Sequence, residues 1–259
     1  MQNLKRTAAF AAGLMIAFAA SGARAGFLLV PPSTPAYITA AVADPARPAA
    51  DTARDPFRKP VDMMVFAHVK PGDKVLELIP GGGYFERIFS GVVGPNGHVY
   101  EAIPTLGAAD ASPKSNGIAA DPHYGNISEI SMSSGAAIAA NAPYDLIWTS
   151  QNYHDLHLTR LHLDIAALDK SLFAALKPGG TFVIVDHAAE LGSGTRDTDK
   201  MHRIDEDLVK KEMKDAGFVL EDESMVLRNP ADDHTLLVFN PAIRGHTDQF
   251  ALRFRKPLS

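Results

Sequence analysis

Three consecutive glycines, Gly81 to Gly83, constrain this chain more than any other feature of its sequence. They follow an apolar run over residues 74–78, which carries one carboxylate, Glu77, and they precede an amphipathic pattern over residues 85–92. This order predicts a strand, a tight turn and a helix, because glycine tolerates positive φ and lets a ligand approach the backbone. The free N–H groups at the start of such a helix form an electropositive cradle. The turn therefore indicates a ligand site, although a purely structural turn can use the same glycines.

Strand and helix patterns alternate through the rest of the chain, which predicts an α/β fold. We predict further strands over residues 98–103, 126–132, 144–149, 181–186, 218–226 and 248–256, and further helices over residues 61–69, 158–176 and 205–216. This alternation gives a mainly parallel sheet that is covered on both faces. Phe250, Leu252 and Phe254 alternate with other residues, so we expect the last strand to be half-buried. Trp148 is assigned to the core, and Tyr153 either to the core or to a stacked substrate.

The N-terminus has the pattern of a secretion signal. Lys5 and Arg6 precede an apolar run over residues 8–20, and Ala23-Arg24-Ala25 matches a small-residue cleavage site. The run is shorter than the roughly 20 residues of a membrane span. We therefore expect residues 1–25 to be a signal peptide that is removed on export to the periplasm, with an uncleaved anchor or a soluble helix as alternatives.

Residues 26–60 are rich in proline, alanine and charged residues, which indicates a linker followed by a short helical arm that starts near Thr34-Pro35. Such an arm can lie across the mouth of the ligand site or pack loosely. The regular pattern over residues 61–259 predicts one domain.

Composition narrows the range of partners. The chain has 30 acidic and 25 basic residues, a net charge of −5 and no basic block, which argues against a nucleic-acid substrate. Because it has no cysteine, a disulfide, a thiolate nucleophile and a cysteine zinc site are excluded. We expect a small-molecule partner and no stable membrane insertion once the signal is removed. The oligomeric state is left open.

Three stretches together resemble the class I S-adenosylmethionine-dependent methyltransferases. They are residues 77–83, residues 144–148 and residues 176–185, and the resemblance covers residues 60–256. It implies a Rossmann-like, doubly wound, seven-stranded sheet, mainly parallel with an antiparallel last strand. It also implies S-adenosylmethionine as the cofactor and an unidentified small molecule as the methyl acceptor.

The same resemblance implies which residues bind the cofactor. They are Glu77, Pro80, Gly81, Gly82, Gly83, Tyr84, Glu101 and Asn152. Two positions depart from the family pattern. Ile79 stands where the family has its first glycine, and the acidic residue that should end the second strand near Ile103 is replaced by Glu101, two residues earlier on the same strand face.

Polar residues also gather where the predicted strands end, which is where ligands bind in open α/β sheets. His154 and Asp155 follow one strand, and Asp186 and His187 end the next. Methyl transfer from a sulfonium requires in-line placement, and a base if the acceptor must lose a proton. We name His154, Asp155 and His187 as catalytic candidates, with the histidines as bases and Asp155 or Asp186 orienting the ring. Each histidine can instead be a buried structural residue.

Two other functions stay open. Histidine and aspartate also bind zinc, manganese or iron, but no pair has tight helical spacing, so no metal ligand is assigned. An exported protein is also separated from a cofactor that is charged and made in the cytosol. The chain can therefore be an exported ligand-binding protein, or a His/Asp metal-dependent protein, on a methyltransferase-like scaffold.

Overall fold

A computed structural model describes residues 34–103, 116–132 and 138–258 of the protein. The predicted signal peptide and the first part of the predicted linker lie outside these ranges. Within them, no helix combines the length and the apolar character that crossing a membrane requires.

The described chain forms one seven-stranded sheet in the order β3-β2-β1-β4-β5-β7-β6. Strand β7 alone runs opposite to the other six strands. This is the predicted doubly wound architecture with an antiparallel last strand. The strands are β1 (Lys74–Leu78), β2 (His98–Ile103), β3 (Ile127–Ser131), β4 (Tyr144–Ser150), β5 (Leu176–His187), β6 (Val219–Ser224) and β7 (Gln249–Arg255).

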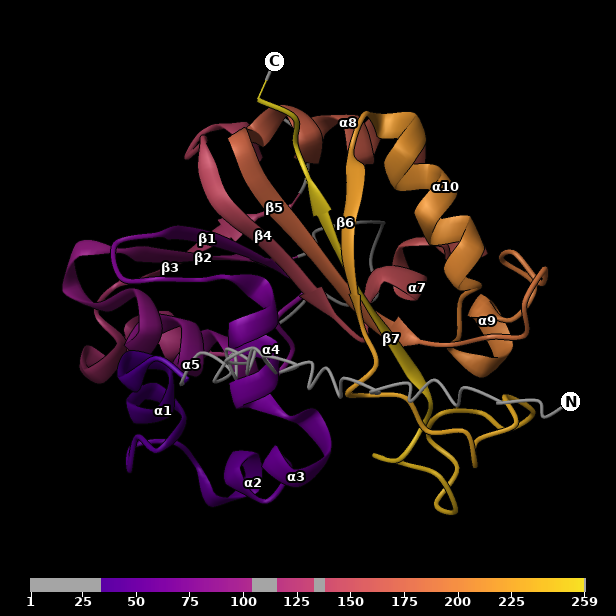
Figure 1. The fold of residues 1–259 in the computed structure, drawn as a ribbon, viewed down its shortest axis with the longest axis horizontal. Coiled ribbons are helices and arrows are strands. Elements are labelled where there is room, and N and C mark those ends of the chain that lie inside the picture. The colour runs from indigo at the N-terminus through magenta and orange to yellow at the C-terminus, as the bar shows by residue number, and fades with distance from the viewer. Residues whose placement is uncertain (1–33, 104–115, 133–137, 259) are drawn as a thin grey trace, which may run out of the picture. The chain divides into compact units, whose positions relative to one another are not determined.

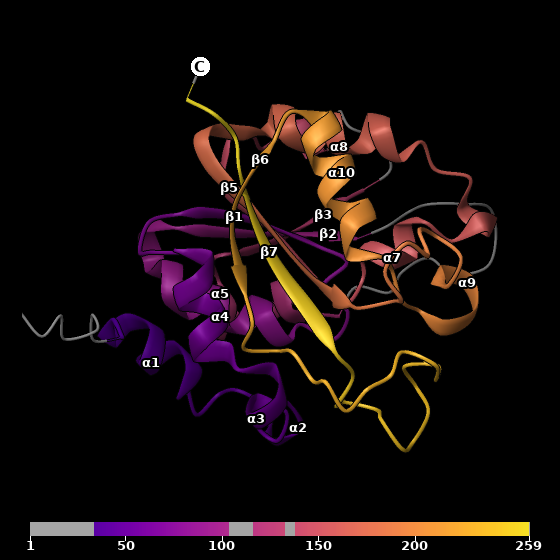
Figure 2. The ribbon, with the colours of Figure 1, turned by 45° about the vertical axis from the view of Figure 1, so that its right-hand side comes forward.

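Helices cover both faces of the sheet (Figure 1). Alternate strand residues point to opposite faces, so every strand except the exposed edge strand β6 contributes to two apolar clusters. One cluster includes side chains from α1 (Ala36–Val42), α4 (Pro60–Ala67) and α5 (Tyr84–Val93). The other includes side chains from α8 (Ile165–Ala175) and α10 (Glu206–Ala216), which lie on the opposite face (Figure 2).

Short elements fill the connections. They are α2 (Ala49–Thr52), α3 (Asp55–Arg58), α7 (Tyr153–Leu156), α9 (Thr198–Met201) and the 3₁₀ turns η1 (Gly94–Asn96), η2 (Ile118–Ala120), η3 (Pro122–Tyr124) and η4 (Thr159–Leu161). Trp148 is fully buried between the rings of Phe85 and Phe89, at centroid distances of 4.8 and 5.4 Å, which confirms its assignment to the core. Tyr153 is fully buried as well.

Three element predictions were wrong in detail. Strand β5 begins at Leu176 rather than at residue 181. The helix predicted over residues 158–176 begins only at Ile165, because His162 adopts φ +49° and Asp164 caps the helix by accepting a hydrogen bond from the Ala167 N–H. Strand β7 is buried on both faces rather than half-buried. Arg253 is only 5% exposed there, because its guanidinium pairs with Glu221 and donates to the carbonyl of Phe66.

Candidate active site

A cleft opens at the carboxyl ends of β1, β4 and β5, the edge that the sequence predicts for ligand binding. It consists of two adjoining cavities of about 230 and 570 Å³. The smaller cavity lies against the glycine turn, and the larger one lies against the segment before β7. The residues that line both are Arg54, Arg58, Gln151, His187, Val238 and Phe239.

The glycine turn presents bare backbone to the smaller cavity. A Cβ placed on Gly81 or Gly82 would meet no atom within 4 Å, whereas a Cβ on Gly83 would lie 1.8 Å from Cδ1 of Ile118. Gly81 and Gly82 therefore leave room for a ligand, and Gly83 is required by packing and by its φ of +78°. Ile79 has φ +52°, a conformation that is strained for a β-branched residue. The backbone thus keeps a glycine-like conformation at the position where the residue is isoleucine.

Three carboxylates are buried beneath this turn. Glu77 and Glu101 lie opposite each other on β1 and β2, and Glu86 lies on α5; each is at most 3% exposed. Burial raises the pKa of Glu77 well above its usual value, and burial together with Glu77 and Glu101 raises the pKa of Glu86. Glu77 Oε2 and both oxygens of Glu101 have no hydrogen-bond partner. These unsatisfied oxygens are sealed beneath the turn and line neither cavity.

His154 sits in a network of two aspartates and a second histidine. Its Nδ1 lies 2.8 Å from Asp186 Oδ1, and its Nε2 lies 3.2 Å from His202 Nδ1 and 3.3 Å from Asp155 Oδ1. Asp155 Oδ1 is also 3.3 Å from His202 Nδ1. Burial alone would lower the pKa of His154, but Asp186 and Asp155 raise it to about 10. Asp186 therefore orients this ring, as the sequence suggests.

His187 lines both cavities but has different partners. Its Nδ1 lies 2.7 Å from Thr247 Oγ1, so Thr247 rather than an aspartate orients the ring. Burial lowers the pKa of His187 to about 3 despite the nearby Asp186. The ring is consequently neutral at physiological pH.

The arm before the domain forms one wall of the cleft. Arg47 and Asp55 form a bidentate ion pair, and Tyr84 on α5 donates a 2.6 Å hydrogen bond to Asp55. Arg58, which follows on α3, donates to Gln151 Oε1 at 2.9 Å and lies 4.6 Å from the centre of the Tyr84 ring. The arm therefore lies across the mouth of the site and is not a loosely packed linker.

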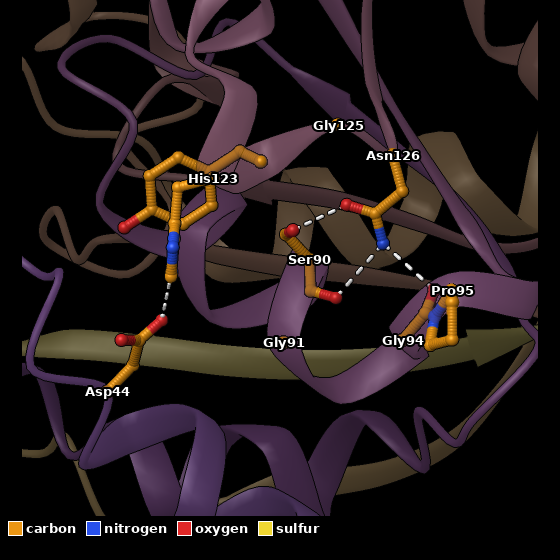
Figure 3. Close-up of a pocket in the computed structure, with 9 residues that line it drawn as sticks. Asp44, Ser90, Gly91, Gly94, Pro95, His123, Gly125 and Asn126 are labelled. Carbon is orange, nitrogen blue, oxygen red and sulfur yellow. Dashed lines mark hydrogen bonds and ion pairs between the residues drawn. The ribbon is translucent and has the colours of Figure 1, made fainter.

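A separate hollow of about 420 Å³ lies at the opposite edge of the sheet, before β2 and β3 (Figure 3). Most of its polar side chains already pair with one another, although the buried hydroxyl of Tyr124 has no hydrogen-bond partner. His123 Nε2 contacts Asp44 Oδ2 at 2.9 Å, and Asn126 bonds to Ser90 and to the carbonyl of Gly94. This edge carries the amino ends of the strands, so we assign no ligand to it.

Comparison with known proteins agrees with the geometry. No protein-family model matches the chain. The structure superposes on a SAM-dependent methyltransferase from Aquifex aeolicus with a TM-score of 0.54 and 15% identity, covering 79% of this chain and 93% of that one. An S-adenosylmethionine-dependent methyltransferase from Mesorhizobium loti superposes with a TM-score of 0.51 and 16% identity, covering 78% of this chain and 99% of that one. The chain has the methyltransferase fold.

The sequence is similar to that of a protein-L-isoaspartate O-methyltransferase from Methanococcus aeolicus, with 29% identity over 154 residues. The match covers 58% of this chain and 61% of the relative. The chain thus spans less than two thirds of the length of the curated relatives it matches.

On this methyltransferase fold, most of the predicted site residues meet in the smaller cavity. Its lining includes Pro80, Gly81, Gly82, Tyr84, Asn152, His154, Asp155 and His187. Glu77, Gly83 and Glu101 do not line it; the two carboxylates lie below the turn and Gly83 opens α5. The catalytic and cofactor-binding roles of these residues stay predictions.

The sequence did not single out several residues of the methyltransferase-fold cleft. They are Arg54, Phe57, Arg58, Gln151, Val238, Phe239 and His246. Gln151 directly follows β4 and adopts φ +64°, a conformation that its residue type does not predict. Arg203 and Asp232, which also stand in loops after predicted strands, form a buried ion pair at 3.0 Å.

Proposed function

We propose that the protein transfers a methyl group from S-adenosylmethionine to a small anionic acceptor. The fold, the bare backbone of Gly81 and Gly82, and the similarity to methyltransferases support the cofactor. The acceptor class is supported by the charge of the larger cavity.

The residues present fit this cofactor. Gly81 and Gly82 would hold it against bare backbone, with Pro80 and Tyr84 beside it. Glu77 and Glu101 lie below the glycine turn and do not line the cavity, so the cradle for the cofactor is formed by the backbone of the turn. Bound S-adenosylmethionine supplies a methyl group on a positively charged sulfonium. The chain's own contribution is then to position the two reactants and exclude water from them.

One observation carries the acceptor class: three arginines line the larger cavity, and no carboxylate lines it with them. Arg54, Arg58 and Arg244 form no ion pair within the described part of the chain. Burial lowers the pKa of Arg58 to about 10, which leaves it cationic at neutral pH. A carboxylate or phosphate would satisfy such guanidinium groups.

The pKa values of the two candidate bases, His154 and His187, are consistent with an anionic acceptor. A general base works best with a pKa near the working pH, but the pKa of His187 is lowered to about 3 and that of His154 is raised to about 10. An acceptor oxygen that is already ionised needs no base. We therefore give His187 a positioning role and retain His154 and Asp155 as the neighbouring polar wall of the site.

The test is methyl transfer to matched pairs of small carboxylic acids and their amides, with radiolabelled S-adenosylmethionine as the donor. We expect labelling of acids only. Arg244→Gln should raise the KM for the acid by about tenfold, since one charge-assisted hydrogen bond is lost, without changing cofactor affinity. Arg160 is exposed and likewise forms no ion pair with any described residue, so Arg160→Gln provides the control. Equal labelling of amides would refute the anionic class.

A second candidate is an exported binding protein that uses the same cleft. Ile79 in a glycine position and the burial of Glu101 favour it, because both depart from the resemblance. A tightly bound anion without methyl transfer would support this candidate. We also propose that residues 1–25 direct export to the periplasm, which cell fractionation and N-terminal sequencing of the mature protein would test.

A further inference from the structure

We propose that His154, Asp155 and His202 bind a divalent transition metal, with zinc as the preferred ion. This proposal goes beyond methyl transfer, and metal binding can be measured without any methyl donor. Among the described residues, this is the only trio of histidine and acidic side chains whose ligand atoms converge within 4.8 Å.

The distances between the three atoms match those of a tetrahedral site. His154 Nε2, His202 Nδ1 and Asp155 Oδ1 form a nearly equilateral triangle with sides of 3.2, 3.3 and 3.3 Å. Zinc binds nitrogen and oxygen at about 2.0–2.2 Å, which places neighbouring ligands of a tetrahedron about 3.3–3.6 Å apart. One ion can therefore contact all three atoms without a large side-chain movement.

The arrangement behind His154 points to the same conclusion. Asp186 is fully buried, and its Oδ1 accepts from His154 Nδ1 while its Oδ2 accepts from the His154 backbone N–H at 2.7 Å. A carboxylate in this place fixes the ring with Nε2 facing the triangle, as in zinc-binding histidines, and a bound ion would displace the proton from Nε2. Asp155 and Asp186 together balance the charge of a divalent ion.

The backbone around His202 also holds that ring in place. His202 has φ +53°, an uncommon conformation, and the next residue is Arg203, whose buried ion pair with Asp232 anchors the segment. Its ring contacts Phe239 at a centroid distance of 5.0 Å. Strained residues that are fixed by their surroundings are concentrated at functional sites.

The fourth coordination position faces the cleft. Asp155 and His202 have side chains that are 31% and 27% exposed, and both His154 and Asp155 line the smaller cavity. Three protein ligands with one open position are typical of catalytic rather than structural zinc sites. The open position would take water or an oxygen of the acceptor.

The experiment uses the full chain without an affinity tag, since a histidine tag would bind metal. The protein is stripped with a chelator, titrated calorimetrically with zinc chloride, and examined by absorption spectroscopy with Co²⁺. We expect binding of one ion per chain and the visible bands of four-coordinate Co²⁺. Asp155→Asn and His202→Ala should each weaken zinc binding by about 100-fold or more.

The matched control is His123→Ala, which removes a histidine that pairs with an aspartate at the opposite edge of the sheet. It should bind zinc as the unmodified chain does. Failure of the unmodified chain to bind zinc, cobalt or manganese would overturn the proposal. So would equal zinc affinity in Asp155→Asn and His202→Ala, each checked by circular dichroism to be folded.

Discussion

The side-chain amide of Asn152 donates a 2.8 Å hydrogen bond to the carbonyl oxygen of Ile79. The same amide donates to the carbonyl of Ser150 at 2.7 Å, so one side chain joins the turn after β1 to the end of β4. Through this contact Asn152 supports the strained backbone of Ile79 and with it the glycine turn.

Replacing Asn152 with alanine should loosen the glycine turn. Each lost hydrogen bond is worth about 1 kcal/mol, so we expect faster amide exchange over residues 79–83 and an approximately tenfold rise in the Kd for S-adenosylmethionine. Hydrogen exchange and calorimetry measure the two effects separately. Asn96→Ala, at an exposed position in η1, is the control, and unchanged exchange in Asn152→Ala would contradict the assigned role.

Arg203 should be among the most important side chains for stability. It is fully buried, pairs with Asp232 at 3.0 Å and donates to the carbonyls of Leu236 and Ala188. Arg203→Met leaves the Asp232 carboxylate buried without its partner, so we expect a loss of about 3–5 kcal/mol in the free energy of unfolding. Urea denaturation provides the measurement.

The control for that variant is Arg196→Met. Arg196 also forms ion pairs, with Glu190 and Asp197, but its side chain is 58% exposed. Solvent screens such pairs, so the change in stability should stay within about 1 kcal/mol. Similar losses in the two variants would show that burial does not set the strength of the Arg203 pair.

Asp169 should make stability fall as pH rises. Burial raises its pKa to about 8, with a further contribution from Glu212, and both carboxylates contact the single hydroxyl of Tyr153, at 3.1 and 3.0 Å. His157 faces Glu212 at 3.2 Å. Because the folded pKa lies above the unfolded value of 3.8, the folded state binds more protons between about pH 4 and pH 8, and stability declines through that window.

Asp169→Asn removes this titration. The variant should therefore lose less stability than the unmodified chain between pH 6 and pH 9, and should be the more stable of the two at pH 9. Urea unfolding curves at both pH values test the prediction. A parallel decline in the two proteins would assign the pH dependence to other groups.

Much of the fold could be predicted because local patterns and tertiary packing agree. Strands β1 and β2 have the predicted bounds, since their apolar runs are delimited by turns. The helix predicted over residues 158–176 was too long because leucine spacing continues through a segment that His162 and Asp164 interrupt. The N-cap preference of Asp164 was the signal that could have placed the start correctly.

The site was predictable where it follows strand ends and unpredictable where it depends on long-range pairing. Asn152 and His154 follow β4 and His187 ends β5, so their place at the cleft could be inferred. The pairing of Arg203 with Asp232 joins residues 29 positions apart, and sequence alone cannot separate a buried pair from two rim charges. For the same reason, the sequence alone does not show that Arg54, Arg58 and Arg244 have no acidic partner among the described residues.

The most direct test of the central claim is calorimetric titration of the purified chain and its Gly82→Asp variant with S-adenosylmethionine. A Cβ on Gly82 meets no atom within 4 Å and the residue has no positive φ, so the variant should fold while placing a negative charge where the cofactor carboxylate would lie. We predict that the unmodified chain binds S-adenosylmethionine, that the affinity of Gly82→Ala stays within about tenfold of it, and that Gly82→Asp does not bind. No binding to the unmodified chain, or equal affinity in Gly82→Asp, would contradict the proposed cofactor site.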